Sequence, residues 1–254
     1  MSRSPSRLSL ATVPVEARAG LHDSLHADVW HAHTLAAPVA HVVATGAAVL
    51  DAQLPGGGWP VGALTELLQN PYQHSEWRLL APALARCGTA AVVLVAPPHV
   101  PFGPALSARG VASQRLLWVH TAAAAQRLWA TEQALRCAGV DAVLAWLPQV
   151  RPEQLRRLQM AASEYNRLLF VMRPSAARQE SSPAVLRLLL APGTDGLDRP
   201  SDTLQVHIFK RRGPPLDHAV VFAAPHAGLA QLLAAAQRPL PLFESHHALD
   251  RTAA

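Results

Sequence analysis

The sequence is almost without lysine. The only lysine among its 254 residues is Lys210, and every other strongly basic side chain is an arginine. A phosphate loop of the kind found in many ATPases needs a lysine that reaches the β- and γ-phosphates, together with glycines whose backbone N–H groups turn toward the ligand. The glycine-rich segment 56–62 is far from Lys210 in the chain. A phosphate loop with its usual lysine is therefore excluded.

Cysteine is also scarce. Cys87 and Cys137 are the only two, they fall in predicted helices, and neither belongs to a CxxC motif. This excludes a disulfide framework and predicts small buried hydrophobic residues in a reducing compartment. The 13 histidines have no cysteine or carboxylate partners at metal-ligand spacing, so we expect no metal site.

Long apolar runs are absent as well. The first apolar stretch is interrupted by Pro14, Glu16 and Arg18 before it could form the core of a signal peptide. No run approaches the length that a bilayer-spanning helix needs. We expect a cytoplasmic protein without a membrane partner. Its net charge of +5, carried almost wholly by arginine, suits contact with phosphate groups or acidic protein surfaces.

The sequence does contain a regular alternation of strand and helix patterns. Continuous apolar runs, typical of strands buried on both faces, alternate with helical segments that begin at a proline or end at a glycine. This alternation predicts an α/β fold in three layers, with a mostly parallel central sheet flanked by helices. The expected strands are 63–68, 92–96, 116–119, 142–147 and 168–172, and the expected helices are 77–86, 104–109, 121–138 and 152–165.

The later part of the chain follows another pattern. Segments 185–190 and 204–209 are strand-like and are joined by a turn-rich stretch, which predicts an antiparallel hairpin at one edge of the sheet. Segment 220–236 is apolar with leucines at helical spacing. We expect three parts: a disordered segment 1–24, a domain over 25–213 that begins with a short amphipathic helix, and a flexible, partly helical extension over 214–254.

The segment after the strand at 63–68 stands where a phosphate loop would lie, and it lacks the necessary chemistry. Between Gln69 and Glu76 there is no glycine and no lysine, and Glu76 would repel a phosphate. A nucleotide site would also need a carboxylate at the end of a later strand to bind the metal ion. The strand at 142–147 offers Trp146 near its end instead.

The approach to this segment resembles the RecA recombinase family. The matching residues are Thr45-Gly46, Leu50-Asp51, Pro55 to Gly58, Pro60, Gly62 and Glu66. On that family's pattern, Gln69, His74, Ser75 and Glu76 hold the positions of the loop's first glycine, second glycine, lysine and threonine, with Asn70 in the same loop. Pro98 stands at the position of the hydrolytic glutamate and Trp146 at that of the metal-binding aspartate. The resemblance implies a RecA-like fold whose ATP-binding positions are lost.

A closer resemblance is to the ImuA, or SulA-like, proteins, a RecA-like family without ATPase residues that is associated with bacterial translesion DNA synthesis. It covers roughly residues 26–215. The landmarks that carry it are 56–67, 79–84, 95–99, 132–136, 144–148, 156–159, 170–174 and 210–213.

This resemblance implies a noncatalytic accessory protein of SOS-induced translesion synthesis that uses no cofactor. The implied partners are an ImuB-like inactive Y-family polymerase, the alpha subunit of an error-prone DNA polymerase and RecA, while direct DNA binding and self-association stay open. The SulA-like name also belongs to SOS proteins that bind the bacterial tubulin homologue and block cell division, which is the alternative function. A third possible function is that of a true ATPase with an unusual phosphate loop.

Two kinds of side chain are candidate contacts. Lys210, Arg211 and Arg212 form the densest positive cluster and follow a predicted strand, so they suit DNA phosphates or a partner, unless they are a solvated strand end. Trp59 in the glycine-rich turn and Trp30 in the N-terminal helix are candidate anchors for a partner protein, although core packing is the favoured interpretation of Trp59.

Overall fold

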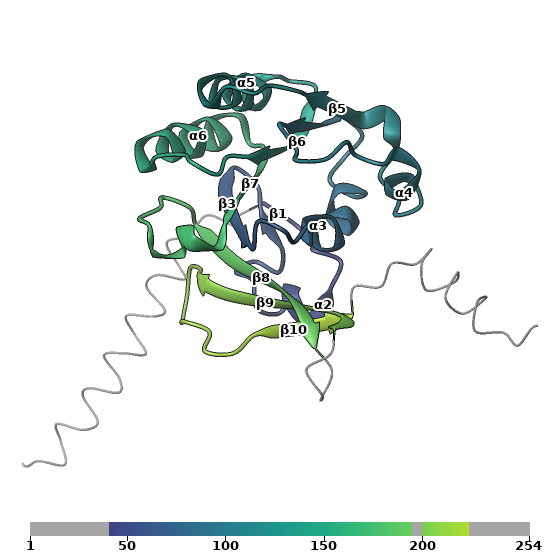
Figure 1. Ribbon diagram of the computed structural model, residues 1–254, viewed down its shortest axis with the longest axis vertical. Helices are drawn as coiled ribbons and strands as arrows, with labels where there is room; N and C mark the ends of the chain where they lie inside the picture. Colours follow the sequence, from purple (N-terminus) through teal and green to yellow (C-terminus); the bar gives the residue numbers. More distant parts are fainter. Residues whose placement is uncertain (1–40, 195–199, 224–254) are drawn as a thin grey trace, which may run out of the picture. The chain divides into compact units, whose positions relative to one another are not determined.

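The centre of the protein is an eight-stranded sheet (Figure 1) in a computed structural model that describes residues 41–194 and 200–223. The strands lie in the order β10-β9-β8-β3-β7-β6-β4-β5. Their bounds are β3 Ala63–Gln69, β4 Ala91–Val95, β5 Leu116–Val119, β6 Val140–Trp146, β7 Leu168–Pro174, β8 Leu186–Thr194, β9 Pro200–Lys210 and β10 Val220–Ala223. Parallel pairing joins β8, β3, β7, β6, β4 and β5. The predicted α/β class with a mostly parallel sheet is confirmed.

The strands of the sheet's centre are buried on both faces. In β4, Val92 and Leu94 belong to one hydrophobic cluster, and Val93 and Val95 belong to the cluster on the opposite face. Successive side chains of a strand point to opposite faces, so a strand covered on both sides needs an unbroken apolar run. This explains why the strand at 91–95 could be predicted from its sequence.

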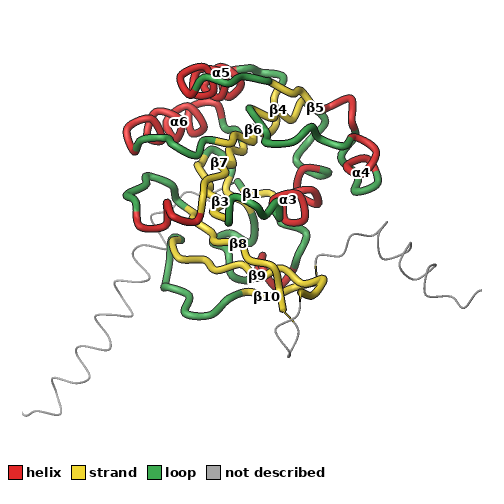
Figure 2. The backbone as a smooth tube through the Cα atoms, in the orientation of Figure 1, coloured by secondary structure: helices red, strands yellow, loops and turns green. Residues whose placement is uncertain are grey.

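Helices cover both faces of the sheet (Figure 2). The helices α5 (Ala124–Arg136) and α6 (Pro152–Tyr165) contribute Leu135 and Leu155 to one cluster. On the other face, α2 (Ala48–Asp51), α3 (Glu76–Leu84) and α4 (Gly103–Ser107) contribute Leu50, Leu80 and Leu106. The three-layer arrangement follows from these two separate clusters.

The antiparallel hairpin is confirmed, but it is not the edge of the sheet. β8 and β9 pair antiparallel, and β10 then pairs antiparallel with β9 on its far side. Val220 is buried opposite Val206, so the sheet continues past the domain boundary predicted at residue 213. The helix pattern predicted over 220–236 is wrong for its first four residues, which are a strand because β9 offers an unpaired edge. The rest of that segment lies outside the described residues.

The prediction that Trp59 could anchor a partner is wrong. Trp59 lies in β2 (Trp59–Pro60), which pairs with β1 (Val42–Val43) in a small antiparallel sheet. Its side chain is fully buried and meets Phe170 edge to face, with ring centroids 5.3 Å apart. A tryptophan side chain carries a large apolar area that favours burial, and Phe170 of β7 packs on its ring. Trp30 and the segments 1–24 and 25–35 lie outside the described residues.

The two cysteines are less buried than predicted. Cys137 is exposed and Cys87 is half-buried, both as free thiols. Burial raises the pKa of the Cys87 thiol, while a hydrogen bond from Arg115 opposes that shift.

Candidate functional site

The loop after β3 has the strand–loop–helix arrangement of a phosphate loop, and protein side chains occupy it. Gln69 ends β3 and Glu76 begins α3. Gln69 Nε2 donates a hydrogen bond to Glu76 Oε2 over 2.7 Å, and Gln69 Oε1 accepts one from the backbone N–H of Ser75 over 3.1 Å. All three residues are buried. One of the backbone N–H groups that a phosphate would need is thus already engaged within the chain.

The Glu76 carboxylate lies at the N-terminus of α3. The first turn of a helix carries partial positive charge and unpaired N–H groups, which attract an anion. Here that anion is a side chain of the protein, and it is only 1 % exposed. A phosphate entering this loop would meet a negative charge in surroundings that screen it poorly. The other loop residue of the prediction, Asn70, is exposed and accepts a hydrogen bond from the backbone of Tyr72.

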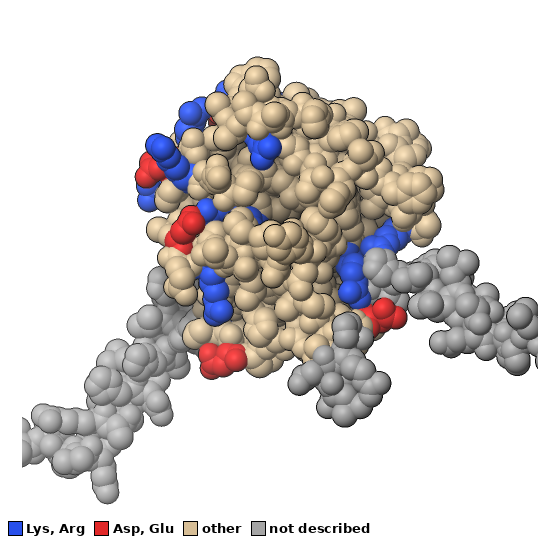
Figure 3. Space-filling model, viewed as in Figure 1, with Lys and Arg blue, Asp and Glu red and all other residues tan. Residues whose placement is uncertain are grey.

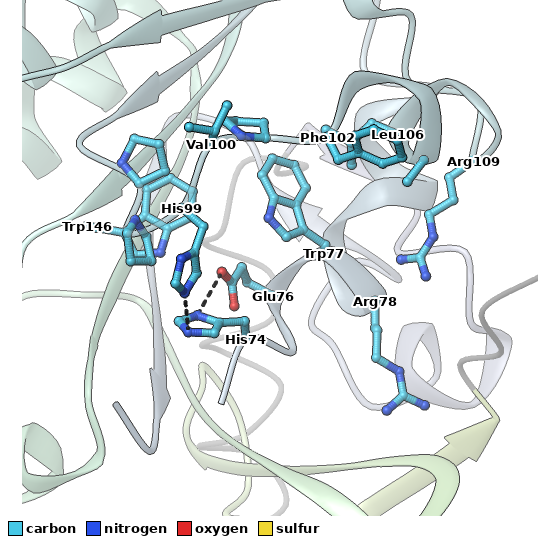
Figure 4. Close-up of a pocket in the computed structure, with 14 residues that line it drawn as sticks. His74, Glu76, Trp77, Arg78, His99, Val100, Phe102, Leu106, Arg109 and Trp146 are labelled. Atoms are coloured by element: carbon cyan, nitrogen blue, oxygen red, sulfur yellow. Dashed lines mark hydrogen bonds and ion pairs between the residues drawn. The ribbon is translucent and has the colours of Figure 1, made fainter. Parts of the chain in front are cut away.

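Two histidines join the loops that follow β3 and β4. The Nε2 atoms of His74 and His99 lie 3.1 Å apart, and the rings meet edge to face with centroids 4.6 Å apart (Figure 4). Such a hydrogen bond needs one nitrogen that donates and one that accepts, so at least one ring is neutral. His74 Nδ1 also lies 3.8 Å from the Glu76 carboxylate. The pair fixes the loop around His74 against the segment that contains Pro98.

Five of the predicted positions meet at one cavity. Gln69, Asn70, His74, Pro98 and Trp146 all line a cavity of about 510 Å³ at the carboxyl ends of β3, β4, β6 and β7. Ligands of open α/β sheets bind at this edge. The residues that line this cavity include no aspartate or glutamate, so none of them could hold a magnesium ion by a carboxylate. These residues lie together, and their chemistry differs from that of a nucleotide site.

Trp146 ends β6, at the position where the RecA pattern has its metal-binding aspartate. Its side chain is 8 % exposed, and its ring centroid lies 6.3 Å from that of Trp77 in α3. Ala96, which follows β4 at the same cavity, has a left-handed backbone with φ of 52°. A residue with a Cβ is strained in that conformation, which occurs more often at functional sites than elsewhere.

The cluster of Lys210, Arg211 and Arg212 divides in the structure. Lys210 Nζ donates to the backbone carbonyl of Ser182 over 2.8 Å, and its pKa is lowered, first by burial and then by the charge of Arg187. Arg211 donates to the carbonyl oxygens of Gln53 and Pro214, tying the end of β9 to the turn after α2. Arg212 is exposed. Two of the three predicted contact residues therefore have structural partners.

A buried ion network holds three strands together. Glu66 in β3 is fully buried and accepts hydrogen bonds from Arg173 of β7 and Arg187 of β8. Arg187 also donates to the carbonyl oxygens of Ala177 and Glu180 and packs on the Phe209 ring. Glu66 belongs to the landmarks of the resemblance, and the structure gives it a structural role.

A basic group that the sequence did not reveal lies beside α3. Arg78, Arg86 and Arg109 line one cavity of about 480 Å³. They come from α3, the turn after it and the turn after α4, so no run of the sequence brings them together. Only the folded chain could have shown this group.

Two kinds of site are not found in the part of the chain that the structure describes. No three histidine, cysteine, aspartate or glutamate side chains within 41–194 and 200–223 are placed to hold a metal ion. Over the same residues, no helix combines the length and the apolar character that a membrane crossing requires.

Comparison with known proteins finds relatives among cell division inhibitors, although no model of a protein family matches the chain. A protein named cell division inhibitor SulA from Edwardsiella piscicida is 29% identical over 119 residues, which are 46% of this chain and 71% of that protein. Another of the same name, from Photorhabdus laumondii subsp. laumondii, is 30% identical over 132 residues, 51% of this chain and 67% of that protein.

Proposed function

The chain belongs to the SulA family, and from that premise we propose that it is an SOS-associated inhibitor of cell division that binds the bacterial tubulin homologue. The relationship to the SulA proteins is the observation that carries this proposal. It favours the division inhibitor over the translesion accessory protein as the first function to test.

We further propose that the protein acts by binding, without turning over a nucleotide. Three features of the carboxyl edge of the sheet support this. Glu76 occupies the N-terminus of α3, Trp146 stands at the end of β6, and no carboxylate lines the larger cavity. Phosphoryl transfer depends on groups that hold the phosphates and on a carboxylate that holds the metal ion, and these three features leave no place for either.

Sedimentation of the bacterial tubulin homologue tests the proposed function. The homologue is assembled with its nucleotide in the presence of increasing amounts of this chain, with no ATP added. We expect the pelleted fraction to fall as the chain approaches an equal molar amount. The matched control is the same chain after irreversible heat denaturation, which should leave the pellet unchanged. Full assembly at a molar excess of folded chain would exclude the inhibitor function.

A second candidate is the accessory role in translesion synthesis. About half of this chain lies outside the segment shared with each SulA relative. The landmarks that resemble ImuA proteins continue to residue 213, which favours a role that uses more of the chain than the SulA relatives account for.

Coexpression distinguishes the two candidates. If the accessory role is right, the chain should copurify with an ImuB-like protein encoded beside it, and neighbouring genes should include an error-prone polymerase. Inhibition of the tubulin homologue without any such copurification would favour the division inhibitor alone.

A further inference from the structure

Two histidines from different loops bring their ring nitrogens together at the carboxyl edge of the sheet. His74 follows β3 and His99 follows β4, 25 residues later in the chain, and their Nε2 atoms lie 3.1 Å apart (Figure 4). His99 is exposed, and the side chain of His74 is 34 % exposed. The pair therefore lies where a small ion from solvent can reach it.

The distance between the two nitrogens fits a shared metal ion. Two histidine nitrogens bound tetrahedrally to one zinc ion, with bonds of about 2.05 Å, lie about 3.3 Å apart. The separation of 3.1 Å is within the tolerance expected of a metal site. The hydrogen bond that now joins the rings is bent: nitrogens pointing straight at each other would separate the ring centres by about 5.4 Å, and the centroids lie 4.6 Å apart. Bent hydrogen bonds are weak, so an ion that replaces this one displaces little.

The other ring nitrogen of His74 faces a carboxylate. His74 Nδ1 lies 3.8 Å from Glu76 Oε1, and Gln69 Nε2 donates a hydrogen bond to Glu76 Oε2 over 2.7 Å. A histidine that binds a metal commonly directs its second nitrogen at a carboxylate, which orients the ring and favours the tautomer that binds. With Nε2 on the ion, the proton of His74 stands on Nδ1, toward Glu76. Gln69 and Glu76 thus supply the support that such a ligand needs.

The charges around the pair also suit a cation. Glu76 is only 1 % exposed, and a positive ion on His74 would lower the cost of burying its carboxylate. Figure 4 places Arg78 and Arg109 on the opposite side of Trp77 from His74. In Figure 3 the basic side chains lie toward the flanks of the molecule, and the surface around α3 between them is mostly uncharged.

The loops hold both histidines in place and leave room for further ligands. His99 stands between Pro97-Pro98 and Pro101, and each proline fixes one backbone angle, which limits the freedom that metal binding would have to remove. His74 lines both the cavity of about 270 Å³ and the cavity of about 510 Å³. Water molecules in these cavities have access to an ion bound at His74.

We propose that His74 and His99 together bind one divalent transition-metal ion, of which zinc is the expected one, through their Nε2 atoms. No third histidine, cysteine, aspartate or glutamate within 41–194 and 200–223 joins them, so water completes the coordination. Imidazole suits zinc, whereas magnesium prefers oxygen ligands. The sequence did not indicate this site because its two ligands meet only in the folded chain. The bound ion joins the loops after β3 and β4, whichever partner the protein has.

Thermal unfolding of the full chain, with a chelator and then with increasing free Zn²⁺, tests the proposal. We expect the midpoint to rise by about 3–6 °C when free zinc exceeds its dissociation constant by about tenfold. A histidine that binds zinc equally in the folded and the unfolded chain does not raise the midpoint, so the measurement reports only sites that the fold creates. Mg²⁺ at the same concentration should leave the midpoint unchanged.

Substitutions assign the rise to the pair. His99→Gln and His74→Gln should each abolish it, because glutamine keeps the capacity to form hydrogen bonds but is a poor zinc ligand. His99 is exposed, so its replacement should not unfold the chain. The matched control is His218→Gln, which changes an exposed histidine before β10 and should leave the rise intact.

A second measurement does not depend on any variant. Diethyl pyrocarbonate modifies accessible histidine nitrogens, and mass spectrometry locates the products. Zinc should protect His99 and leave His218 reactive. Three results would overturn the proposal: no rise of the midpoint with zinc, a rise that His99→Gln reduces no more than His218→Gln does, or a reactivity of His99 that zinc does not change. The pair would then be a hydrogen bond between loops and no more.

Discussion

Glu66 illustrates how a charged side chain can be part of a protein core. It lies between Arg173 and Arg187 with no exposed surface, and the two arginines also bond to backbone carbonyl oxygens. Burying a charge is costly unless it is paired and hydrogen-bonded. In this network the Glu66 carboxylate is the ion-pair partner of both guanidinium groups. Removing one charge leaves a buried charge without its partner, which costs free energy of folding.

Glu66→Gln should therefore lower the free energy of unfolding by about 3–5 kcal/mol, because buried Arg187 loses its carboxylate partner and buried Arg173 keeps only the half-exposed carboxylate of Glu180. Chemical denaturation measures the change. The matched variant is Glu132→Gln, whose arginine partners Arg136 and Arg157 are largely exposed. That change should cost less than about 1 kcal/mol. Equal effects of the two substitutions would contradict the proposed role of Glu66.

Single residues also show which part of the site could be predicted. Aligning the chain on the RecA pattern placed Gln69, His74, Pro98 and Trp146 together, and they do line one cavity. Core packing was the favoured interpretation of Trp59, and its buried ring packs edge to face on Phe170 of β7. The group of Arg78, Arg86 and Arg109 depends on packing between separate elements.

The left-handed backbone of Ala96 predicts that one substitution at this position stabilises the protein. Its left-handed backbone costs about 1–2 kcal/mol for a residue with a Cβ, and glycine avoids that strain. We expect Ala96→Gly to raise the free energy of unfolding by about 0.5–1 kcal/mol, after the entropy cost of glycine. Ala145→Gly, within the regular part of β6, should lower it by a similar amount. The same sign for both changes, measured by thermal or chemical denaturation, would argue against strain at Ala96.

The strands of the parallel part of the sheet were predictable from their apolar runs, including the half-exposed β5 at 116–119. The strands at the centre of the sheet have continuous apolar runs, and α6 begins at Pro152 as its sequence indicates. β10 was missed because four residues of an edge strand carry little pattern, and leucines farther along the chain suggested a helix. Pairing with β9 decides the structure of such a segment, and pairing is not visible in local sequence.

β10 provides a test of alternation along one strand. Val220 is buried against the sheet, whereas Val221 is 50 % exposed. Val220→Asp should lower the free energy of unfolding by about 2–3 kcal/mol, because it buries a charge without a partner. Val221→Asp should change it by less than about 0.5 kcal/mol. If denaturation shows equal losses for both variants, β10 does not pack on the sheet as described.

In the molecule as a whole, the two faces of the sheet and its carboxyl edge have different roles. Helices cover the faces and stabilise the fold, while the loops after β3 and β4 surround the cavities. The carboxyl edge resembles a nucleotide site in its arrangement, and we propose that the chain's own groups, Glu76 first among them, close it to phosphate. We therefore propose that the protein's function depends on contacts with other macromolecules.

Isothermal titration of the full chain with ATP and magnesium tests whether this edge of the sheet admits a nucleotide. With Glu76 at the start of α3 and no lysine in the loop, we predict no saturable binding heat at millimolar nucleotide. Saturable, magnesium-dependent binding in the micromolar range would contradict the claim.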